Sequence, residues 1–136
     1  MPILKRRKTM EYKKSNNVTI RTEQTPTPLK DWLAEGERLF GKDFMQWRFR
    51  CPMCGHVASI REFKEAGAKD PNVAYQECIG RYRGAGAPGA ADGNPDGCNW
   101  AAYGLFGIPN DKGRLILAED GTVVEAFDFA REEVEP

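Results

Sequence analysis

Cysteine is the residue type in this sequence with the clearest chemical use, and two of the four cysteines form a tight motif. Two residues separate Cys51 from Cys54 in the stretch Cys51-Pro52-Met53-Cys54-Gly55-His56. That spacing lets both thiolates reach one ion from a single turn. Gly55 permits the left-handed backbone conformation that such turns use. The motif therefore predicts a metal-binding knuckle.

A closed metal site needs two further ligands, and Cys78 and Cys98 are the remaining thiols. Each stands beside a plausible turn, with Gly80 after the first and Gly97 before the second. The spacing C-x2-C-x23-C-x19-C departs from a ribbon with two knuckles, because a glycine-rich stretch splits the second pair. We predict that Cys51, Cys54, Cys78 and Cys98 bind one structural Zn²⁺. Residue types alone leave iron open, because tetrahedral sulfur suits either metal.

Three other interpretations of these residues stay open. The thiols of Cys51 and Cys54 could form a redox pair, although such pairs usually stand at a helix N-terminus. His56, the one histidine, could replace a thiol as ligand. Cys78 and Cys98 could also be ordinary buried thiols.

The same inventory argues against an enzyme. Four thiolates close the coordination shell and leave no position for a reactive water. No His-x-Glu motif precedes the cysteine pair, and neither a phosphate-binding loop nor a nucleophile elbow is present. We expect a binding module without catalytic activity.

Two strips mix cations with aromatic rings, as proteins that bind single-stranded nucleic acid do. They are Trp47-Arg48-Phe49-Arg50 and Arg81-Tyr82-Arg83. The candidate nucleic-acid contacts are Lys5, Arg6, Arg7, Lys8, Arg48, Arg50, Arg81 and Arg83. Alternatively the arginines offset the thiolate charge, and the aromatic rings of an alternating strand lie in the core. A factor that binds a host or defence protein is the other partner class considered.

The formal net charge is +0, but the charge is unevenly distributed. Residues 1–30 carry +6 and residues 111–136 carry -5, which argues against nucleic-acid binding by the whole surface. We predict a flexible basic arm (1–26), one zinc-binding domain (27–130) and an acidic tail (131–136). A mean hydropathy of -0.60 and the lack of a long apolar run argue against a membrane span. The N-terminus has no apolar signal segment, so we expect a cytoplasmic location.

Hydrophobic periodicity predicts an amphipathic helix over residues 28–40, with Thr27 as its cap, Pro28 at its first position and Gly41 at its end. Its expected apolar face consists of Leu29, Trp32, Leu33, Gly36, Leu39 and Phe40. Residues 47–50 alternate as a half-buried strand does. Ser59 and Glu62 form a capping box for a short helix that ends near Ala66.

The second half of the chain predicts a strand over residues 73–80, a long surface loop over 84–97 and a hairpin around Asp120-Gly121. Trp32 and Trp100 are expected to lie in the core. The resulting fold class is α+β: a small zinc-ribbon-like domain with a split four-cysteine site, an N-terminal amphipathic helix and a C-terminal β-hairpin.

Several stretches resemble a family of small uncharacterised four-cysteine proteins of phage and prophage-bearing bacterial genomes. The similar pieces, together with Phe127-Asp128-Phe129, are EGERLFG (35–41), WRFRCPMCGH (47–56), YQECIGRY (75–82) and GCNWAAYGLF (97–106). The resemblance implies that all four cysteines belong to one motif set. It also implies a phage or prophage origin and action inside a bacterial host, and it supplies no activity.

Overall fold

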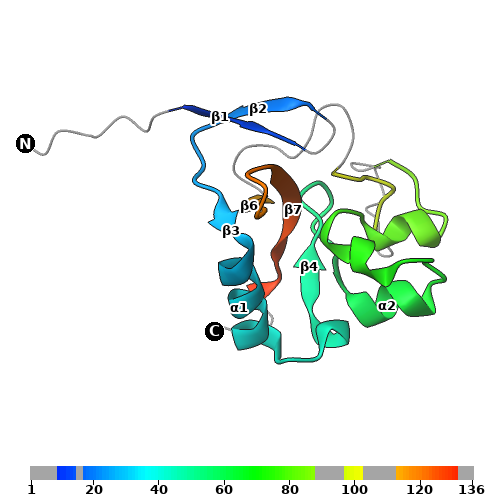
Figure 1. Cartoon of the computed structure of the whole chain (residues 1–136). Helices are drawn as coiled ribbons and strands as arrows, with labels where there is room; N and C mark the ends of the chain where they lie inside the picture. Colours follow the sequence, from blue (N-terminus) through cyan, green and yellow to red (C-terminus); the bar gives the residue numbers. More distant parts are fainter. Residues whose placement is uncertain (1–8, 15–16, 88–96, 103–112, 132–136) are drawn as a thin grey trace, which may run out of the picture.

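The computed structural model describes residues 9–14, 17–87, 97–102 and 113–131. These residues form a mixed α+β structure, as predicted, with a two-stranded sheet, a five-stranded sheet and two α-helices (Figure 1). The strands are β1 (Met10–Lys13), β2 (Thr19–Thr22), β3 (Thr27–Pro28), β4 (Arg48–Arg50), β5 (Val57–Ser59), β6 (Gly113–Leu117) and β7 (Val123–Phe129). The helices are α1 (Leu29–Phe40), α2 (Ile60–Glu65) and the 3-10 turns η1 (Phe44–Gln46), η2 (Pro71–Tyr75) and η3 (Ile79–Tyr82).

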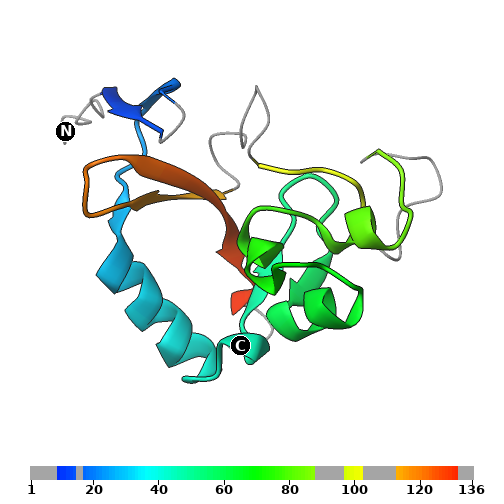
Figure 2. The same cartoon turned by 45° about the vertical axis from the view of Figure 1, so that its right-hand side comes forward.

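The five-stranded sheet has the strand order β3-β6-β7-β4-β5. The β6–β7 pair is the hairpin that the sequence predicted, with Gly121 at a φ of 87° in its turn. Strand β7 continues past β6 and pairs with β4, where Phe49 lies opposite Phe129. Helices α1 and α2 lie on opposite sides of β4 and β7 in both views (Figures 1 and 2).

Helix α1 is confirmed with its end at Phe40, but it begins at Leu29, because Pro28 belongs to β3 and not to the first helical position. Its buried face carries Trp32, Gly36 and Leu39. The Trp32 ring stacks on Phe129 with a centroid distance of 5.2 Å. The prediction for Leu33 is wrong, because that side chain is exposed on the helix flank. The expected cap is also wrong. Thr27 belongs to β3, and no side-chain cap bond is present at Pro28.

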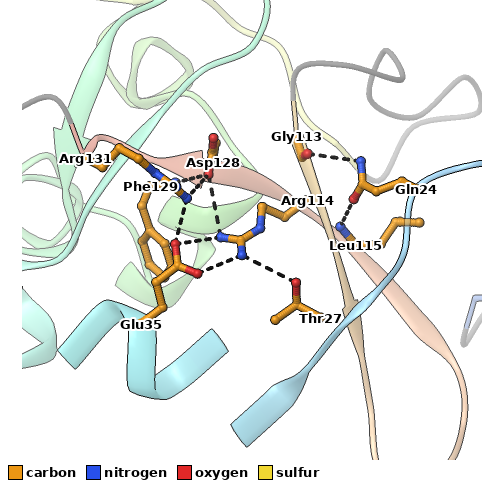
Figure 3. A network of polar contacts seen from close by, with 9 residues as sticks. All are labelled: Gln24, Thr27, Glu35, Gly113, Arg114, Leu115, Asp128, Phe129 and Arg131. Atoms are coloured by element: carbon orange, nitrogen blue, oxygen red, sulfur yellow. Dashed lines mark hydrogen bonds and ion pairs between the residues drawn. The ribbon is translucent and has the colours of Figure 1, made fainter. Parts of the chain in front are cut away.

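A network of charged groups fastens α1 to the sheet (Figure 3). Glu35 of α1 accepts hydrogen bonds from Arg114 of β6 at 2.7 and 2.9 Å, and from Arg131 at 2.7 Å. Asp128 of β7 accepts a further bond from Arg131 at 3.2 Å. The helix is therefore held both by apolar stacking at Trp32 and by a carboxylate, that of Glu35, shared between two guanidinium groups.

The capping box before α2 is confirmed. The Ser59 side chain accepts from the Glu62 amide, and the Glu62 carboxylate accepts from the Ser59 amide. Both free amides at this helix start are thus satisfied. Phe63, on the inner face of α2, is almost fully buried.

The strand predicted over residues 73–80 is wrong. Two 3-10 turns, η2 and η3, cover most of this stretch. The Asp70 side chain caps η2 by accepting from the Asn72 amide, and Pro71 fixes φ at the first position of the turn. These local signals outweigh the apolar alternation that favoured a strand.

The described part of residues 1–26 contains secondary structure, whereas the flexibility predicted for this arm stays a prediction. Strands β1 and β2 pair antiparallel there, and the expected extended piece near Ile20 is β2. The Gln24 amide donates to the Gly113 carbonyl at 3.3 Å and accepts from the Leu115 amide at 2.7 Å. Its side chain thereby covers the edge of β6 ahead of β3. Residues 1–8, 15–16, most of the expected surface loop, residues 103–112 and most of the expected acidic tail lie outside the described residues.

None of the described helices is both long and apolar enough to cross a membrane. A zinc-ribbon fold is not confirmed.

Candidate metal centre

The first half of the centre is a knuckle at the tip of the β4–β5 hairpin. The Cys51 amide donates to the His56 carbonyl at 2.9 Å, and the Gly55 amide donates to the Cys51 carbonyl at 2.9 Å. Gly55 adopts a φ of 80°, as the sequence predicted. The paired strands on both sides fix the direction in which Cys51 and Cys54 present their sulfurs.

The second half is assembled from two segments that are distant in sequence. The Cys78 amide donates to the Trp100 carbonyl at 3.0 Å, and the Ala102 amide donates to the Gln76 carbonyl at 2.7 Å. Glu77 and Ala101 form an antiparallel bridge between these bonds. This short ladder places Cys98 beside Cys78. Two separate segments therefore supply the ligands that one continuous second knuckle supplies in a zinc ribbon.

Two glycines allow these segments to approach. A Cβ on Gly80 would lie 2.4 Å from the Cys98 backbone nitrogen, and one on Gly97 would lie 2.8 Å from the Cys78 sulfur. Gly97 also adopts a φ of 94°. The sequence analysis placed turns at these glycines but did not recognise their packing role. The signal in the sequence that could have indicated this packing is the glycine close to each of these two cysteines, Gly80 after Cys78 and Gly97 before Cys98.

The four sulfurs form one cluster in which all lie within 4.8 Å of one another. Cys51 and Cys98 are separated by 3.8 Å, and Cys54 and Cys78 by 3.7 Å. A metal–sulfur distance of about 2.3 Å gives a tetrahedron with edges of about 3.8 Å. A disulfide would require about 2.05 Å. The thiols are therefore spaced for a shared ion, and all four are free cysteines.

The local environment shifts the pKa values of three of the thiols in different directions. The hydrogen bond with Cys51 lowers the pKa of Cys78 to about 5, with help from the backbone amides of Cys98 and Gly80. The same thiol contact and burial raise the pKa of Cys51. Burial raises the pKa of Cys98 to about 12. A cation bound among the four sulfurs would favour ionisation of all of them.

Each half of the centre contains one arginine that hydrogen-bonds to the carbonyl directly after a cysteine, and we call these two residues, Arg50 and Arg81, the clipping arginines. Arg50 donates to the Gly55 carbonyl at 2.7 Å, directly after Cys54. Arg81 donates to the Asn99 carbonyl at 2.7 Å, directly after Cys98. Both guanidinium groups place positive charge next to a cluster whose formal charge would be about -2 with a divalent ion bound. This geometry supports the interpretation that the arginines offset the thiolates.

The aromatic residues predicted to interleave with these cations do not form a stacking surface. Trp47 and Phe49 are only 2% and 3% exposed and belong to the core. The Tyr82 hydroxyl donates to the buried Glu77 carboxylate, and its ring packs on Phe63. Arg83 lies 3.7 Å from the Glu62 carboxylate. The other candidate contacts, Lys5, Arg6, Arg7 and Lys8, lie outside the described residues.

Trp32 is confirmed in the core, whereas Trp100 is half-buried and stacks on Phe127 at a centroid distance of 5.8 Å. The cysteine pair lies in a turn between strands, and not at the start of α2, so the helix-dipole arrangement of a redox pair is missing here. Among the described residues, the cluster of potential metal ligands consists of the cysteines without His56. His56 contributes its backbone carbonyl to the knuckle.

A family model described as VVA0879-like matches residues 28–130, which include every cysteine and both clipping arginines. No curated protein matches the chain, and no solved structure does. The resemblance to one uncharacterised family is thus confirmed at the level of the family, while a phage or prophage origin stays a prediction.

Proposed function

The chain belongs to the VVA0879-like family, and we propose that it is a zinc-dependent binding protein without catalytic activity. The observation that carries this proposal is the clustering of four free sulfurs within 4.8 Å of one another, two pairs of which lie 3.7 and 3.8 Å apart. The family description names no activity, so the proposal rests on the cluster.

Zinc is favoured over other ions by the ligand set. Four thiolates form the usual structural zinc site, although iron accepts the same ligands. With every position taken by sulfur, no site remains for a reactive water, which supports a structural role for the ion. Four reduced thiols in one cluster also support action in a reducing compartment.

Metal content measures this proposal directly. We expect one equivalent of zinc per chain in the purified protein, and loss of most of it in Cys78→Ser. A full equivalent retained in Cys78→Ser would contradict the four-thiol assignment. One equivalent of iron with a visible absorption band would contradict zinc and leave the cluster intact.

A protein partner is the second candidate, and the surface of the knuckle favours it. Met53 at the tip of the knuckle is 42% exposed. Met53 also lines a cavity of about 500 Å³, together with the other knuckle residues from Cys51 to Gly55, Arg50, Asp128 and Phe129. An exposed methionine next to mixed polar groups is typical of protein-binding surfaces.

For this candidate we expect capture of one specific partner that survives nuclease treatment and is lost with Met53→Asp. Capture that nuclease abolishes would instead favour nucleic acid. A Leu33→Asp variant is the matched control, because Leu33 is similarly exposed but lies on α1.

A further inference from the structure

Among the described residues, the hairpin of β1 and β2 leaves both of its outer strand edges unpaired. The hairpin lies at one end of the molecule, over β6 and β7, in both views (Figures 1 and 2). Its two strands form a separate sheet that pairs with none of the other described strands. An isolated two-stranded hairpin is marginally stable by itself, so contacts with the rest of the protein must hold it.

One such contact is an ion pair between Lys14 and Glu125 of β7. The two side chains are only 13% and 10% exposed. Tyr12 and Ile20, which are partners in the hairpin register, are half-buried on the same face. The hairpin is therefore fixed with one face toward the body, and its edges are presented in a defined direction.

The register shows which backbone groups point outward from β1. The Lys14 amide donates to the Val18 carbonyl at 2.9 Å, so this pair faces inward between the strands. Inward and outward groups alternate along an antiparallel pair. The amide and carbonyl groups of Glu11 and Lys13 therefore point away from β2. In the described part of the chain, these outward groups have no hydrogen-bond partner.

The side chains of the same two residues are self-complementary. Glu11 and Lys13 are both exposed. If two β1 strands pair antiparallel about Tyr12, Glu11 of each copy lies opposite Lys13 of the other. The outward backbone groups of the two strands then form hydrogen-bonded pairs between the same residues. Backbone and side-chain complementarity thus select one register.

The outer edge of β2 lacks this property. The equivalent pairing about Ile20 would place Thr19 opposite Arg21, which adds no opposite charge. Glu11 pairs with Arg21 across the hairpin at 3.4 Å, but its side chain stays 63% exposed and can still face Lys13 of a second copy. The charge pattern therefore distinguishes the two edges.

We propose that β1 is a self-association edge, through which two copies of this chain pair antiparallel into a four-stranded sheet with Glu11 of each copy opposite Lys13 of the other. This inference is independent of the metal proposal, since the hairpin contains no cysteine. A four-residue contact is smaller than a standard protein interface, so the dimer forms at high protein concentration. Like charges directly opposite each other destabilise such a pair.

Sedimentation velocity over a concentration series of the full, metal-loaded chain tests the proposal. The wild type should shift toward the dimer mass as concentration rises. Glu11→Lys and Lys13→Glu should each associate about tenfold more weakly, because each places like charges opposite one another. A 1:1 mixture of these two variants should regain the wild-type dimer fraction, since all facing charges are then opposite.

The mixture also separates a lost interface from a damaged hairpin. Glu11→Lys breaks the ion pair with Arg21 as well, and mixing would not repair that damage. Glu23→Lys, an exposed charge change outside both strands, should associate as the wild type does. A wild type that stays monomeric throughout would overturn the proposal and favour another protein's extended segment as the occupant. Lys13→Glu leaves the Arg21 pair intact, so wild-type association of this variant alone would overturn the proposal as well.

Discussion

The sulfurs of Cys51 and Cys98 lie 3.8 Å apart, although their positions in the chain differ by 47. Cys51 is held by a hairpin, whereas Cys98 is held by a short ladder to the segment around Cys78. A bound ion therefore links parts of the chain that local structure alone does not connect. Such a link raises the stability of the folded state, because the unfolded chain offers no preformed site.

Removal of the metal should unfold the region around the second half of the centre. Structural zinc contributes about 10–16 kcal/mol in small zinc domains, which is comparable to the whole free energy of unfolding of a domain this size. We expect a strong chelator to abolish the cooperative thermal transition seen by circular dichroism. Added zinc should restore it and added magnesium should not. An unchanged transition after complete metal removal would show that the core folds without the ion.

Gly80→Ala should weaken metal binding by about 10–100-fold, a range typical of residues that support metal ligands. The added Cβ would lie 2.4 Å from the Cys98 backbone nitrogen, so the two ligand-bearing segments must separate. Competition with a coloured chelator measures the affinity. Gly86→Ala is the matched control, because nothing lies within 4 Å of its Cβ position. Equal affinities of the two variants would refute the close packing.

Loss of either clipping arginine should accelerate metal release by about tenfold. Arg50→Gln and Arg81→Gln each remove a charged donor at 2.7 Å from a carbonyl beside a ligand cysteine. The readout is the rate of zinc transfer to excess chelator. Arg61→Gln, an exposed change on α2, should release metal at the wild-type rate. Arg50→Lys and Arg81→Lys keep the positive charge but lose the planar guanidinium group. If the charge is the more important property, these variants should release zinc more slowly than the Gln variants do.

Glu35→Gln should lower the free energy of unfolding by about 1–3 kcal/mol, the usual scale for hydrogen bonds to a charged group. The guanidinium of Arg114 holds the pKa of Glu35 below its usual value of 4.5, and Arg131 acts in the same direction. A lowered pKa means that the stabilisation is complete above the unfolded value and is lost as the pH falls through the folded value. The difference between wild type and Glu35→Gln should therefore stay constant from pH 8 to about 5.

Urea unfolding at several pH values measures this difference. Glu37→Gln on the same helix is the control, because Glu37 is exposed. Its effect should stay within about 0.5 kcal/mol. A difference that disappears between pH 7 and 5 would contradict the assigned direction of the pKa shift.

Local signals in the sequence predicted much of this architecture. The presence and C-terminal end of α1, the capping box of α2 and the β6–β7 turn follow from periodicity, the Ser59–Glu62 pair and the Asp120-Gly121 pair. The left-handed Gly55 followed in the same way from the knuckle motif. Each of these features is determined within a few residues.

The second half of the centre could not be derived in this way. Its ladder joins Gln76 to Ala102 and Cys78 to Trp100, and no local periodicity encodes a pairing across that separation. The strand predicted around Val73 failed because the Asp70 cap and Pro71 favour a 3-10 turn. The helix cap at Thr27 failed because that residue pairs with Ile116 of β6, which is distant in the chain.

X-ray absorption at the zinc edge of the purified protein tests the central claim most directly. Four cysteines that share one ion predict a first shell of four sulfurs at about 2.3 Å, with no nitrogen or oxygen. A shell of that composition in the wild type, reduced to three sulfurs in Cys98→Ser, is the expected result. A nitrogen or oxygen ligand in the wild-type shell, or an unchanged shell in Cys98→Ser, would contradict the account.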